Sequence, residues 1–254
     1  MNLDQLIFEE LKLQNANSIY DIYPDFNWTT YKKLNPYLYI IGLRTEKEYT
    51  YNYLLEGRYK GRNYKNTEIF SLHILIATLG KNNIFNILKI LKRDLTEIDY
   101  LTIVFDGEKS KNIDLVKKEI IDFKCNVNII VESKNLGFWG HGIRNKYNDL
   151  KGDFVYHIDD DDILYDDSFK IIRKYCNNKN IIYIFKIVLK NNNIIWKSKN
   201  IKINEISTQS GVIPTEFNKN SYWSLKYGGD FDFYKKLSNN YRMLFIDKVI
   251  YRKT

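Results

Sequence analysis

The stretch Phe154-Val155-Tyr156-His157-Ile158-Asp159-Asp160-Asp161-Asp162 places four consecutive aspartates directly after an apolar run. The run is rich in β-branched and aromatic residues and follows the turn-forming Lys151-Gly152-Asp153, which predicts a buried strand. The aspartates then lie at the carboxyl end of that strand, the edge at which open α/β sheets bind ligands. Because neighbouring carboxylates repel one another, we expect this cluster to sit in water or on a cation.

Strands and helices alternate around this run. The pattern predicts strands at 72–77, 100–105, 127–131 and 154–158, and helices at 86–95, 113–123 and 142–150. Further along, it predicts a helix at 169–175, strands at 181–189 and 194–197, and a helix at 231–237. Such alternation is typical of the α/β class, with a mostly parallel sheet and helices on both faces. A Gly-x-Gly-x-x-Gly fingerprint is absent after the first strand.

The first part of the chain has a helical pattern instead. An amphipathic stretch ends near Pro24, and a helix beginning at Trp28 is predicted to stop before Pro36. Thr45 and Glu48 have the spacing of a capping box, which opens another helix that runs toward Gly57. We therefore divide the chain into an N-terminal helical module, residues 1–65, and an α/β domain, residues 66–254.

Composition narrows the class of protein. The chain has 254 residues, a net charge of +8 and lysines that are scattered along the sequence. This distribution favours a solvated basic surface that attracts an anionic ligand, and we predict no nucleic-acid partner.

Cys125 and Cys176 form no CxxC and imply no disulfide framework. Without a signal peptide or an apolar run near the ~20 residues of a membrane helix, we expect a soluble cytoplasmic protein with no membrane-spanning segment.

Polar residues follow the first two strands of the α/β pattern. Ala77 and Thr78 end the first strand beside Leu79-Gly80, which leaves room for a ligand and offers it polar groups. Asp106 ends the second strand, where a carboxylate can accept a hydrogen bond from a ribose hydroxyl or a base N–H. An Asp-Gly turn that caps itself explains Asp106 equally well.

The stretch 135–145 combines three glycines with an aromatic pair and two basic side chains ahead of a helix. The helix N-terminus can face a phosphate, with Arg144 or His141 adding charge. Gly137 and the other glycines are costly for stability alone, which favours a binding loop. Trp139 could also cap the core.

Two further carboxylate groups are candidates for chemistry. Asp159 and Asp161 stand on alternate residues, so their side chains point the same way and can share one cation. A twelve-residue calcium loop is excluded because its glycine and terminal glutamate are missing. Gly228-Gly229-Asp230 delivers a carboxylate to the head of a helix. A solvated acidic turn at 159–162 and helix capping by Asp230 remain the alternatives.

In order and spacing, residues 70–250 resemble family-2-like glycosyltransferases of the GT-A type. Ala77-Thr78 resembles the first nucleotide loop of that family, and 157–162 resembles its metal-binding Asp-x-Asp. The stretch from Asn135-x-Gly137 through Arg144-Asn145, followed by 151–155, resembles its Asn-x-Gly…Arg-Asn…Gly-(Asp/Glu)-Tyr-(Ile/Val) run. Its catalytic Gly-Glu-Asp corresponds to Gly228-Gly229-Asp230, where Gly229 replaces the glutamate. Asp232 is therefore a substitute candidate for the base.

Residues 26–62 carry a second resemblance. Trp-x2-Tyr-x2-Leu-Asn-Pro, followed by Thr45-Glu46-Lys47-Glu48, an aromatic pair and Glu-Gly-Arg, is similar to a short helical module. That module accompanies glycosyltransferases and polysaccharide-related proteins in some giant viruses and bacteria. Tyr37 stands where that module usually has an aspartate, and its tryptophan before the glycine is missing. A plain helical hairpin that packs aromatic side chains on the main domain fits equally well. If the gene is viral, the protein would work in the host cytoplasm.

The GT-A resemblance implies a Rossmann-like, mostly parallel sheet and metal-dependent transfer of a sugar from a nucleotide-diphosphate sugar, with a UDP-sugar favoured. The acceptor would be a hydroxyl of a glycan or glycoconjugate, and the transfer would invert the anomeric centre. Mn²⁺ (or Mg²⁺) would bind Asp159 and Asp161. The remaining implied roles are Asp230 or Asp232 as catalytic base; donor binding by Ala77, Thr78, Asp106, Gly137, His141, Arg144, Asp159 and Asp160; and a sugar or acceptor pocket of Trp139, Thr208, Gln209 and Pro214.

Two other functions remain open from the sequence. A nucleotidyltransferase also uses an α/β fold with metal-binding carboxylates, although Leu79-Gly80-Lys81 is a poor version of its phosphate loop. A catalytically inactive module that binds glycan or nucleic acid is compatible with the basic charge and the many aromatic residues. A two-carboxylate glycosidase needs neither a metal nor a nucleotide loop and explains less of the chain. Oligomeric state, base and sugar are not predicted.

Overall fold

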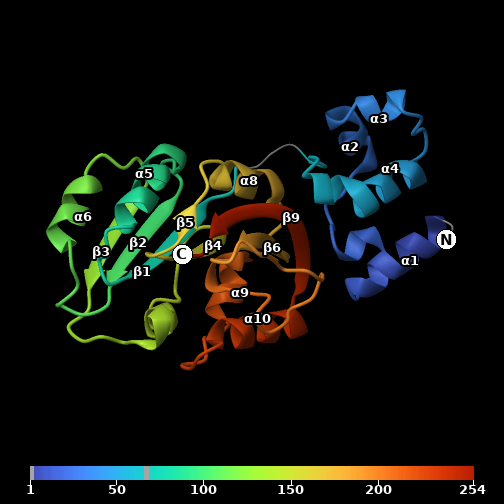
Figure 1. The fold of residues 1–254 in the computed structure, drawn as a ribbon. Coiled ribbons are helices and arrows are strands. Elements are labelled where there is room, and N and C mark those ends of the chain that lie inside the picture. Colours follow the sequence, from blue (N-terminus) through green and yellow to red (C-terminus); the bar gives the residue numbers. More distant parts are fainter. Residues whose placement is uncertain (1–2, 66–68) are drawn as a thin grey trace.

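The computed structural model describes residues 3–65 and 69–254. Within these ranges one nine-stranded sheet has helices on both faces (Figure 1). In spatial order its strands are β3 (Asn126–Val131), β2 (Tyr100–Phe105), β1 (Leu72–Thr78), β4 (Phe154–Asp159), β8 (Gly211–Pro214), β6 (Ile181–Val188), β9 (Arg242–Arg252) and β5 (Ile163–Leu164), while β7 (Ile194–Ile195) pairs with β6. The helices around it are α5 (Ile84–Asp94), α6 (Ile113–Glu119), α7 (His141–Lys146), α8 (Ser168–Tyr175), α9 (Thr215–Lys219) and α10 (Gly229–Asn240).

The predicted α/β class is confirmed, and most paired residues lie in parallel ladders. β3, β2, β1 and β4 form a parallel run, as the alternating pattern predicts. Beyond β4 the sheet is mixed, because β8 runs antiparallel to both β4 and β6, while β9 is parallel to β6. The sequence pattern missed β5, β8, β9 and α9, and it made α6 and α7 too long.

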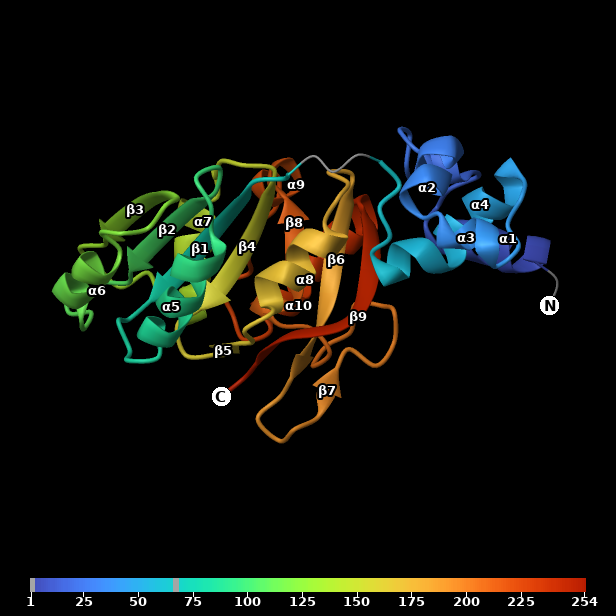
Figure 2. The same ribbon diagram turned by 90° about the horizontal axis from the view of Figure 1, so that it is seen from above.

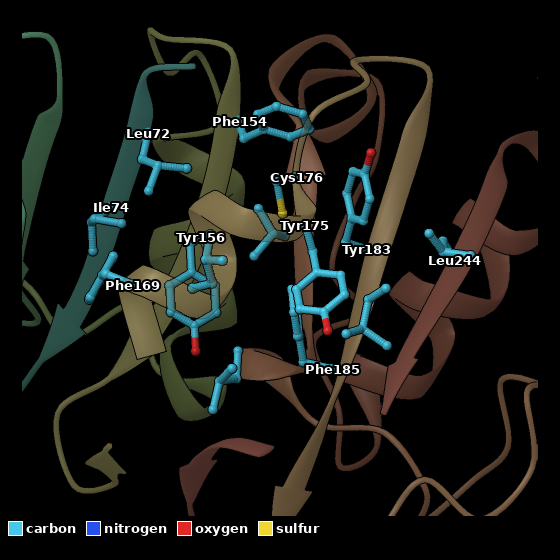
Figure 3. Packing of buried hydrophobic residues seen from close by; sticks show 14 of the residues in the cluster. Leu72, Ile74, Phe154, Tyr156, Phe169, Tyr175, Cys176, Tyr183, Phe185 and Leu244 are labelled. Atoms are coloured by element: carbon cyan, nitrogen blue, oxygen red, sulfur yellow. The ribbon is translucent and has the colours of Figure 1, made fainter. Parts of the chain in front are cut away.

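Alternating side chains of β1 explain how one sheet holds two apolar layers. Leu72, Ile74 and Ile76 belong to the large core that also contains the inner side chains of α5 and α8. Leu75 and Ala77 point to the other face, where they pack in a smaller cluster with side chains of α7. Figure 3 shows side chains of β1, β4, β6 and α8 meeting in the large core. The strands are therefore buried on both faces, which holds their carboxyl ends rigidly.

The N-terminal helices pack beside β6 and β9 (Figures 1 and 2). They are α1 (Leu3–Leu13), α2 (Trp28–Leu34), α3 (Tyr37–Ile40) and α4 (Glu46–Asn52), with short turns at Ile19–Asp21, Tyr53–Gly57 and Arg58–Lys60. Thr45 and Glu48 form the predicted capping box at α4, and α2 ends before Pro36 as predicted. The structure adds α3, which the sequence pattern did not predict.

This N-terminal module shares a core with the sheet. Its buried aromatic side chains belong to the same apolar cluster as those of β1 and β4. The Asn178 amide donates to Ile22 O at 3.1 Å, and the Gln14 amide donates to Met243 O at 3.3 Å. A division into residues 1–65 and 66–254 stays a prediction, and its boundary residue 66 lies outside the described residues. None of the described helices is long and apolar enough to cross a membrane.

His73 in β1 is a buried titratable side chain whose tautomer is set by two hydrogen bonds. The Lys151 backbone N–H donates to His73 Nδ1 at 2.9 Å, so the ring proton lies on Nε2, which is 2.9 Å from Thr102 Oγ1. The ring is almost completely buried, and burial lowers the pKa of His73 to about 4. A histidine in an unfolded chain titrates near pH 6.5. Between these values the unfolded state binds one proton more.

Acid should therefore destabilise the fold through His73. Because the unfolded state binds the extra proton, the free energy of unfolding falls as the pH falls from about 6.5 toward 4. We expect His73→Gln to make this decline shallower by about 1.4 kcal/mol per pH unit. Urea denaturation of both proteins between pH 7.5 and 4.5 measures the two slopes. Equal slopes would mean that the folded ring is protonated at the same pH as the unfolded one.

Candidate active site

The predicted site residues come together because three parallel strands end at one edge. Ala77 at the end of β1 pairs with Asp159 at the end of β4, and Thr78 pairs with Phe105 at the end of β2. Asp106 follows Phe105 directly, and its backbone N–H donates to Thr78 O at 2.8 Å. Ala77, Thr78, Asp106 and the acidic cluster thus lie side by side at the carboxyl edge of the sheet.

Asp160 holds the loop after β1 in place. Its Oδ2 accepts hydrogen bonds from Thr78 Oγ1 at 2.6 Å, from the Leu79 N–H at 3.1 Å and from the Lys81 N–H at 3.3 Å. Gly80 N–H donates to Thr78 Oγ1 at 2.7 Å. Three donors on one oxygen compensate the buried charge. Asp160 therefore shapes the pocket wall through the backbone of residues 79–81.

Asp159 and Asp161 are paired with cations at the pocket surface. Arg144 is fully buried and donates through Nη2 to Asp159 Oδ1 and through Nη1 to Trp139 O. Lys81 Nζ lies 2.8 Å from Asp161 Oδ2, and this ion pair is about half exposed. The hydrogen bond to Asp161 raises the pKa of Lys81. Both carboxylates thus have a cationic partner while they line the pocket.

Asp162 is the buried member of the cluster. Its Oδ2 accepts from Gln209 Nε2 at 2.7 Å, and its Oδ1 accepts from the Thr254 N–H at 3.2 Å. Burial, reinforced by the charges of Asp159 and Asp161, raises the pKa of Asp162 to about 7. Gln209 was predicted to lie in the sugar pocket, but its side chain is buried and acts on Asp162 instead.

Asp106 supports the loop that begins at Asn135. Its two carboxylate oxygens accept from the backbone N–H groups of Leu136 and Gly137, at 2.6 and 3.2 Å. The Asn135 side-chain amide returns a hydrogen bond to Asp106 O at 3.1 Å. Asp106 still lines the pocket. Its hydrogen bonds join the carboxyl end of β2 to the 135–140 loop.

The 135–140 loop lifts an aromatic side chain to the pocket rim. Phe138 and Trp139 both have left-handed backbone conformations, with φ of 55° and 53°, which are costly for large side chains. The indole of Trp139 is 67 % exposed, so it does not cap the core. Its ring centroid lies 6.0 Å from that of Tyr227 in an edge-to-face arrangement. The strained turn thus places Trp139 at the surface, where its ring contacts Tyr227.

Gly140 and Gly229 lack a side chain where Arg144 and His141 pack against the backbone. A Cβ at Gly140 would lie 2.7 Å from the Ala77 Cβ and 2.8 Å from Arg144 Nη1. A Cβ at Gly229 would lie 2.2 Å from Ser224 O and 2.6 Å from His141 Nδ1. The missing glutamate at position 229 therefore has a steric reason, because the His141 ring and the Ser224 carbonyl fill that space.

His141 is held in one tautomer beside Asp230. Its Nδ1 lies 3.0 Å from Ser224 O, so Nδ1 carries the proton, and the ring packs on Trp223 with centroids 5.2 Å apart. Burial and the nearby Arg144 guanidinium lower the pKa of His141, which keeps the ring neutral. In the described residues Nε2 forms no hydrogen bond with another protein atom. This nitrogen is available to a ligand.

Asp230 stands in the first turn of α10 and faces the pocket. Gly228, with a left-handed φ of 76°, is the N-cap, so Asp230 does not cap the helix. Its Oδ1 accepts from the Phe231 N–H at 2.8 Å. Asp232 pairs with Lys226 at 2.8 Å, and this hydrogen bond lowers the pKa of Asp232. Only Asp230 of the two predicted base candidates lines the pocket.

These residues surround a pocket of about 660 Å³. Of the residues predicted from the sequence, the pocket lining contains Ala77, Thr78, Asp106, Gly137, Trp139, His141, Asp159, Asp160, Asp161, Thr208 and Asp230. Arg144, Gln209, Pro214 and Asp232 are not part of the lining. Pro214 pairs with Phe154 at the opposite end of β4, because β8 runs antiparallel to that strand and leads away from the site. The placement of Pro214 in the sugar pocket was wrong.

The structure adds pocket residues that the sequence did not identify. Lys81 comes from the loop after β1, and Lys253 and Thr254 come from the segment after β9. Tyr227 and Phe231 extend the wall that carries Asp230. For Lys81 the signal was its place three residues after Thr78, the hydroxyl residue at the strand end, and directly after Gly80. For Lys253 there was no local signal, since only the path of β9 brings it to the acidic cluster.

Asp159 and Asp161 fit a divalent cation that is shared with a diphosphate. Both carboxylates line one pocket, and a hard cation bound in this way needs only one or two protein carboxylates beside substrate phosphates. Among the described side chains, no group of three or more His, Cys, Asp or Glu could enclose a metal ion by itself. The donor set therefore suits a cation that arrives with its phosphate ligand.

Comparison with known proteins gives the fold. No family model matches the sequence, and no curated protein is detectably similar to it. Residues 1–349 of S. aureus TarS, a GT-A-type glycosyltransferase, superpose with a TM-score of 0.58 at 17 % identity, covering 72 % of this chain and 60 % of that one. The mannosyltransferase PcManGT from Pyrobaculum calidifontis, in complex with GDP-Man and Mn²⁺, gives 0.55 at 12 % identity, covering 74 % and 57 %.

The chain thus has the fold of a GT-A glycosyltransferase. It spans about 60 % of TarS 1–349 and 36 % of the longer TarS structure. TarS 1–349 has also been crystallised in complex with UDP-GlcNAc, and this structure superposes with a TM-score of 0.58.

The packing around Gly229 generates a test. Alanine normally favours a helix over glycine, but at Gly229 its methyl group would meet the Ser224 carbonyl and the His141 ring. We expect Gly229→Ala to lower the free energy of unfolding by about 3 kcal/mol and to shift the His141 imidazole resonances. Gly228→Ala is the matched control, because nothing lies within 4 Å of its added Cβ. Its left-handed backbone alone should cost about 1 kcal/mol. Equal losses in both variants would contradict the steric explanation.

Proposed function

We propose that the protein is a metal-dependent glycosyltransferase, related to family 2, that moves a sugar from a nucleotide-diphosphate sugar to an acceptor hydroxyl. One observation carries the proposal: the ends of β1, β2 and β4 and the head of α10 face one pocket, with Asp159 and Asp161 on one wall and Asp230 on another. A GT-A fold and structural neighbours with UDP-GlcNAc and GDP-Man support it. A UDP-sugar is the donor that the sequence resemblance favours.

The donor would lie along the carboxyl edge of the sheet. Ala77, Thr78 and Gly137 leave room for the nucleoside, and Asp106 places the loop that covers it. The diphosphate would lie at the acidic cluster, where Asp159 and Asp161 form the proposed Asp-x-Asp ligand pair. A bound Mn²⁺ or Mg²⁺ would neutralise the charge that develops on the leaving diphosphate. Lys81 and Lys253 add positive charge at the same wall, while Arg144 fixes the Asp159 carboxylate.

Transfer needs a base for the acceptor hydroxyl. Asp230 faces the pocket, and its Oδ2 accepts no hydrogen bond within the described residues. In a single displacement the acceptor oxygen bonds to the anomeric carbon, the bond from that carbon to the diphosphate oxygen breaks, and the acceptor proton passes to Asp230. The anomeric centre is then inverted. His141 Nε2 can accept a hydrogen bond from a sugar hydroxyl beside it.

The acceptor would enter over the aromatic rim. Trp139 and Tyr227 offer broad apolar surfaces with polar edges, which suit the apolar face of a sugar ring. Thr208 lies in the same wall. We therefore propose a glycan or glycoconjugate as the acceptor, with its reacting hydroxyl directed toward Asp230.

Asp161 provides the first test of the metal role. We expect Asp161→Asn to lower Mn²⁺-dependent release of nucleotide diphosphate from UDP-GlcNAc or GDP-mannose at least 100-fold, because a neutral amide is a weak cation ligand. Thermal unfolding should stay within a few degrees of wild type, since the Asp161 side chain is about half exposed. Asp166→Asn is the matched control on an exposed aspartate just beyond β5. Full turnover by Asp161→Asn would remove this carboxylate from the mechanism.

Asp230 provides the test of the base. We expect Asp230→Asn to retain donor affinity within a factor of about 3 and to lose transfer at least 100-fold, because general-base catalysis contributes about 10² to 10⁴. The assay is sugar transfer to a glycan acceptor mixture, with donor binding measured by calorimetry. Asp232→Asn should leave both quantities unchanged. If Asp232→Asn loses transfer instead, the base is Asp232.

A further inference from the structure

The N-terminal module presents an apolar surface that its own core does not use. Tyr37, Tyr39, Ile40 and Ile41, here called the α3 tip, have exposed fractions of 41, 49, 81 and 64 %. Leu38, in the middle of the same short helix, is fully buried and anchors it. Single exposed apolar residues are ordinary, but four within five residues form a contiguous patch. None of the four lines the candidate active site.

Cationic side chains surround the α3 tip. Arg44 Cζ lies 3.9 Å and Lys32 Nζ lies 5.2 Å from the centroid of the Tyr39 ring. Arg62 Cζ lies 5.3 Å from the ring of Tyr37. Within the described residues, Lys32 and Arg44 form no ion pair with a carboxylate. Lys32 and Arg44 therefore keep their charge available while their stems pack on the aromatic rings, whereas Arg62 pairs with Glu56.

Three cations without a carboxylate partner among the described residues lie in α2 and just before α4. Residues 28–65 contain eight lysines and arginines and only three glutamates, whereas residues 1–27 contain five acidic residues and one lysine. Of those glutamates, Glu48 is held by the backbone N–H groups of Arg44 and Thr45, and Glu56 pairs with Lys60 and Arg62. Lys47, Arg58 and Lys65 pair with Asp4, Glu10 and Asp25. Among the described residues, Lys32, Lys33 and Arg44 are the cations of this range that form no ion pair, and they favour an anionic partner.

We propose that the α3 tip docks the protein reversibly on an anionic lipid bilayer. Ile40 and Ile41 enter the boundary between headgroups and acyl chains, and Tyr37 and Tyr39 lie at headgroup level, where tyrosine is favoured. Lys32, Lys33 and Arg44 contact lipid phosphates. Apolar side chains beside Lys32 and Arg44, which pair with no carboxylate among the described residues, match such a surface. The proposal does not depend on the proposed enzymatic function.

Two physical consequences follow from this arrangement. α3 has only four residues, so docking is shallow and depends on a few apolar side chains. The electrostatic part is screened by salt, because the Debye length falls from about 10 Å at 0.1 M to about 3 Å at 1 M. Binding should therefore need anionic lipid, weaken with salt and be sensitive to changes at Ile40 and Ile41.

Vesicle co-sedimentation of the full chain tests this proposal. Wild-type protein should sediment with vesicles of 70 % phosphatidylcholine and 30 % phosphatidylserine at 0.1 M salt, and at least fivefold less with pure phosphatidylcholine or at 0.5 M salt. The double variant Ile40→Asp, Ile41→Asp should lose at least 90 % of this binding. Ile121→Asp is the matched control, because Ile121 is 76 % exposed just beyond α6 in the α/β domain, and it should bind like wild type.

A charge variant and a mass measurement complete the test. Lys32→Ala with Arg44→Ala should weaken binding to the anionic vesicles at least fivefold, and circular dichroism should show that all variants are folded. The proposal is overturned if wild type does not bind anionic vesicles, or if Ile121→Asp loses binding as the double variant does. It is also overturned if light scattering shows a wild-type dimer that the double variant abolishes, since the α3 tip would then join two copies of the chain.

Discussion

Mutual repulsion among the carboxylates of Asp159–Asp162 is the constraint on which this structure depends. Four adjacent negative charges at the end of a buried strand are unstable unless each receives its own partner. The partners come from different parts of the chain. Thr78 and the loop after β1 donate hydrogen bonds to Asp160, and Arg144 of α7 forms an ion pair with Asp159. Lys81 forms an ion pair with Asp161, while Gln209 and Thr254 donate hydrogen bonds to Asp162. Compensation of this charge therefore joins the loop after β1, α7, the Thr208–Ser210 turn and the segment after β9 at one end of the pocket.

The same constraint explains several local features of the site. Arg144 reaches Asp159 only because Gly140 leaves space beside Ala77, and the loop that carries Gly140 is itself held by Asp106. The strained conformation of Phe138 and Trp139 is the cost of that loop, and it leaves the indole at the rim. Across the pocket, His141 fills the space beside Gly229 and keeps a free ring nitrogen near Asp230.

The sequence predicted the parallel half of the fold well, because β1, β2 and β4 are short apolar runs between clear helices. It missed β8 and β9, whose pairing depends on distant partners rather than on their own pattern. The acidic cluster could be placed at the site from its position at a strand end, and Asp230 from the resemblance of Gly228-Gly229-Asp230 to the Gly-Glu-Asp motif. Lys253 could not, since β9 alone brings it there, and Pro214 was misplaced because the direction of β8 was unknown.

The account as a whole predicts that the pocket binds a nucleoside diphosphate together with a divalent cation. Calorimetric titration of the wild-type chain with UDP, GDP, CDP and dTDP, each with Mn²⁺ and with EDTA, measures this directly. Binding of one nucleotide with Mn²⁺, and its loss with EDTA, is the predicted result and would identify the donor class. If none of the four nucleotides binds with Mn²⁺ present, the pocket is not a donor site and the proposed transfer reaction is wrong.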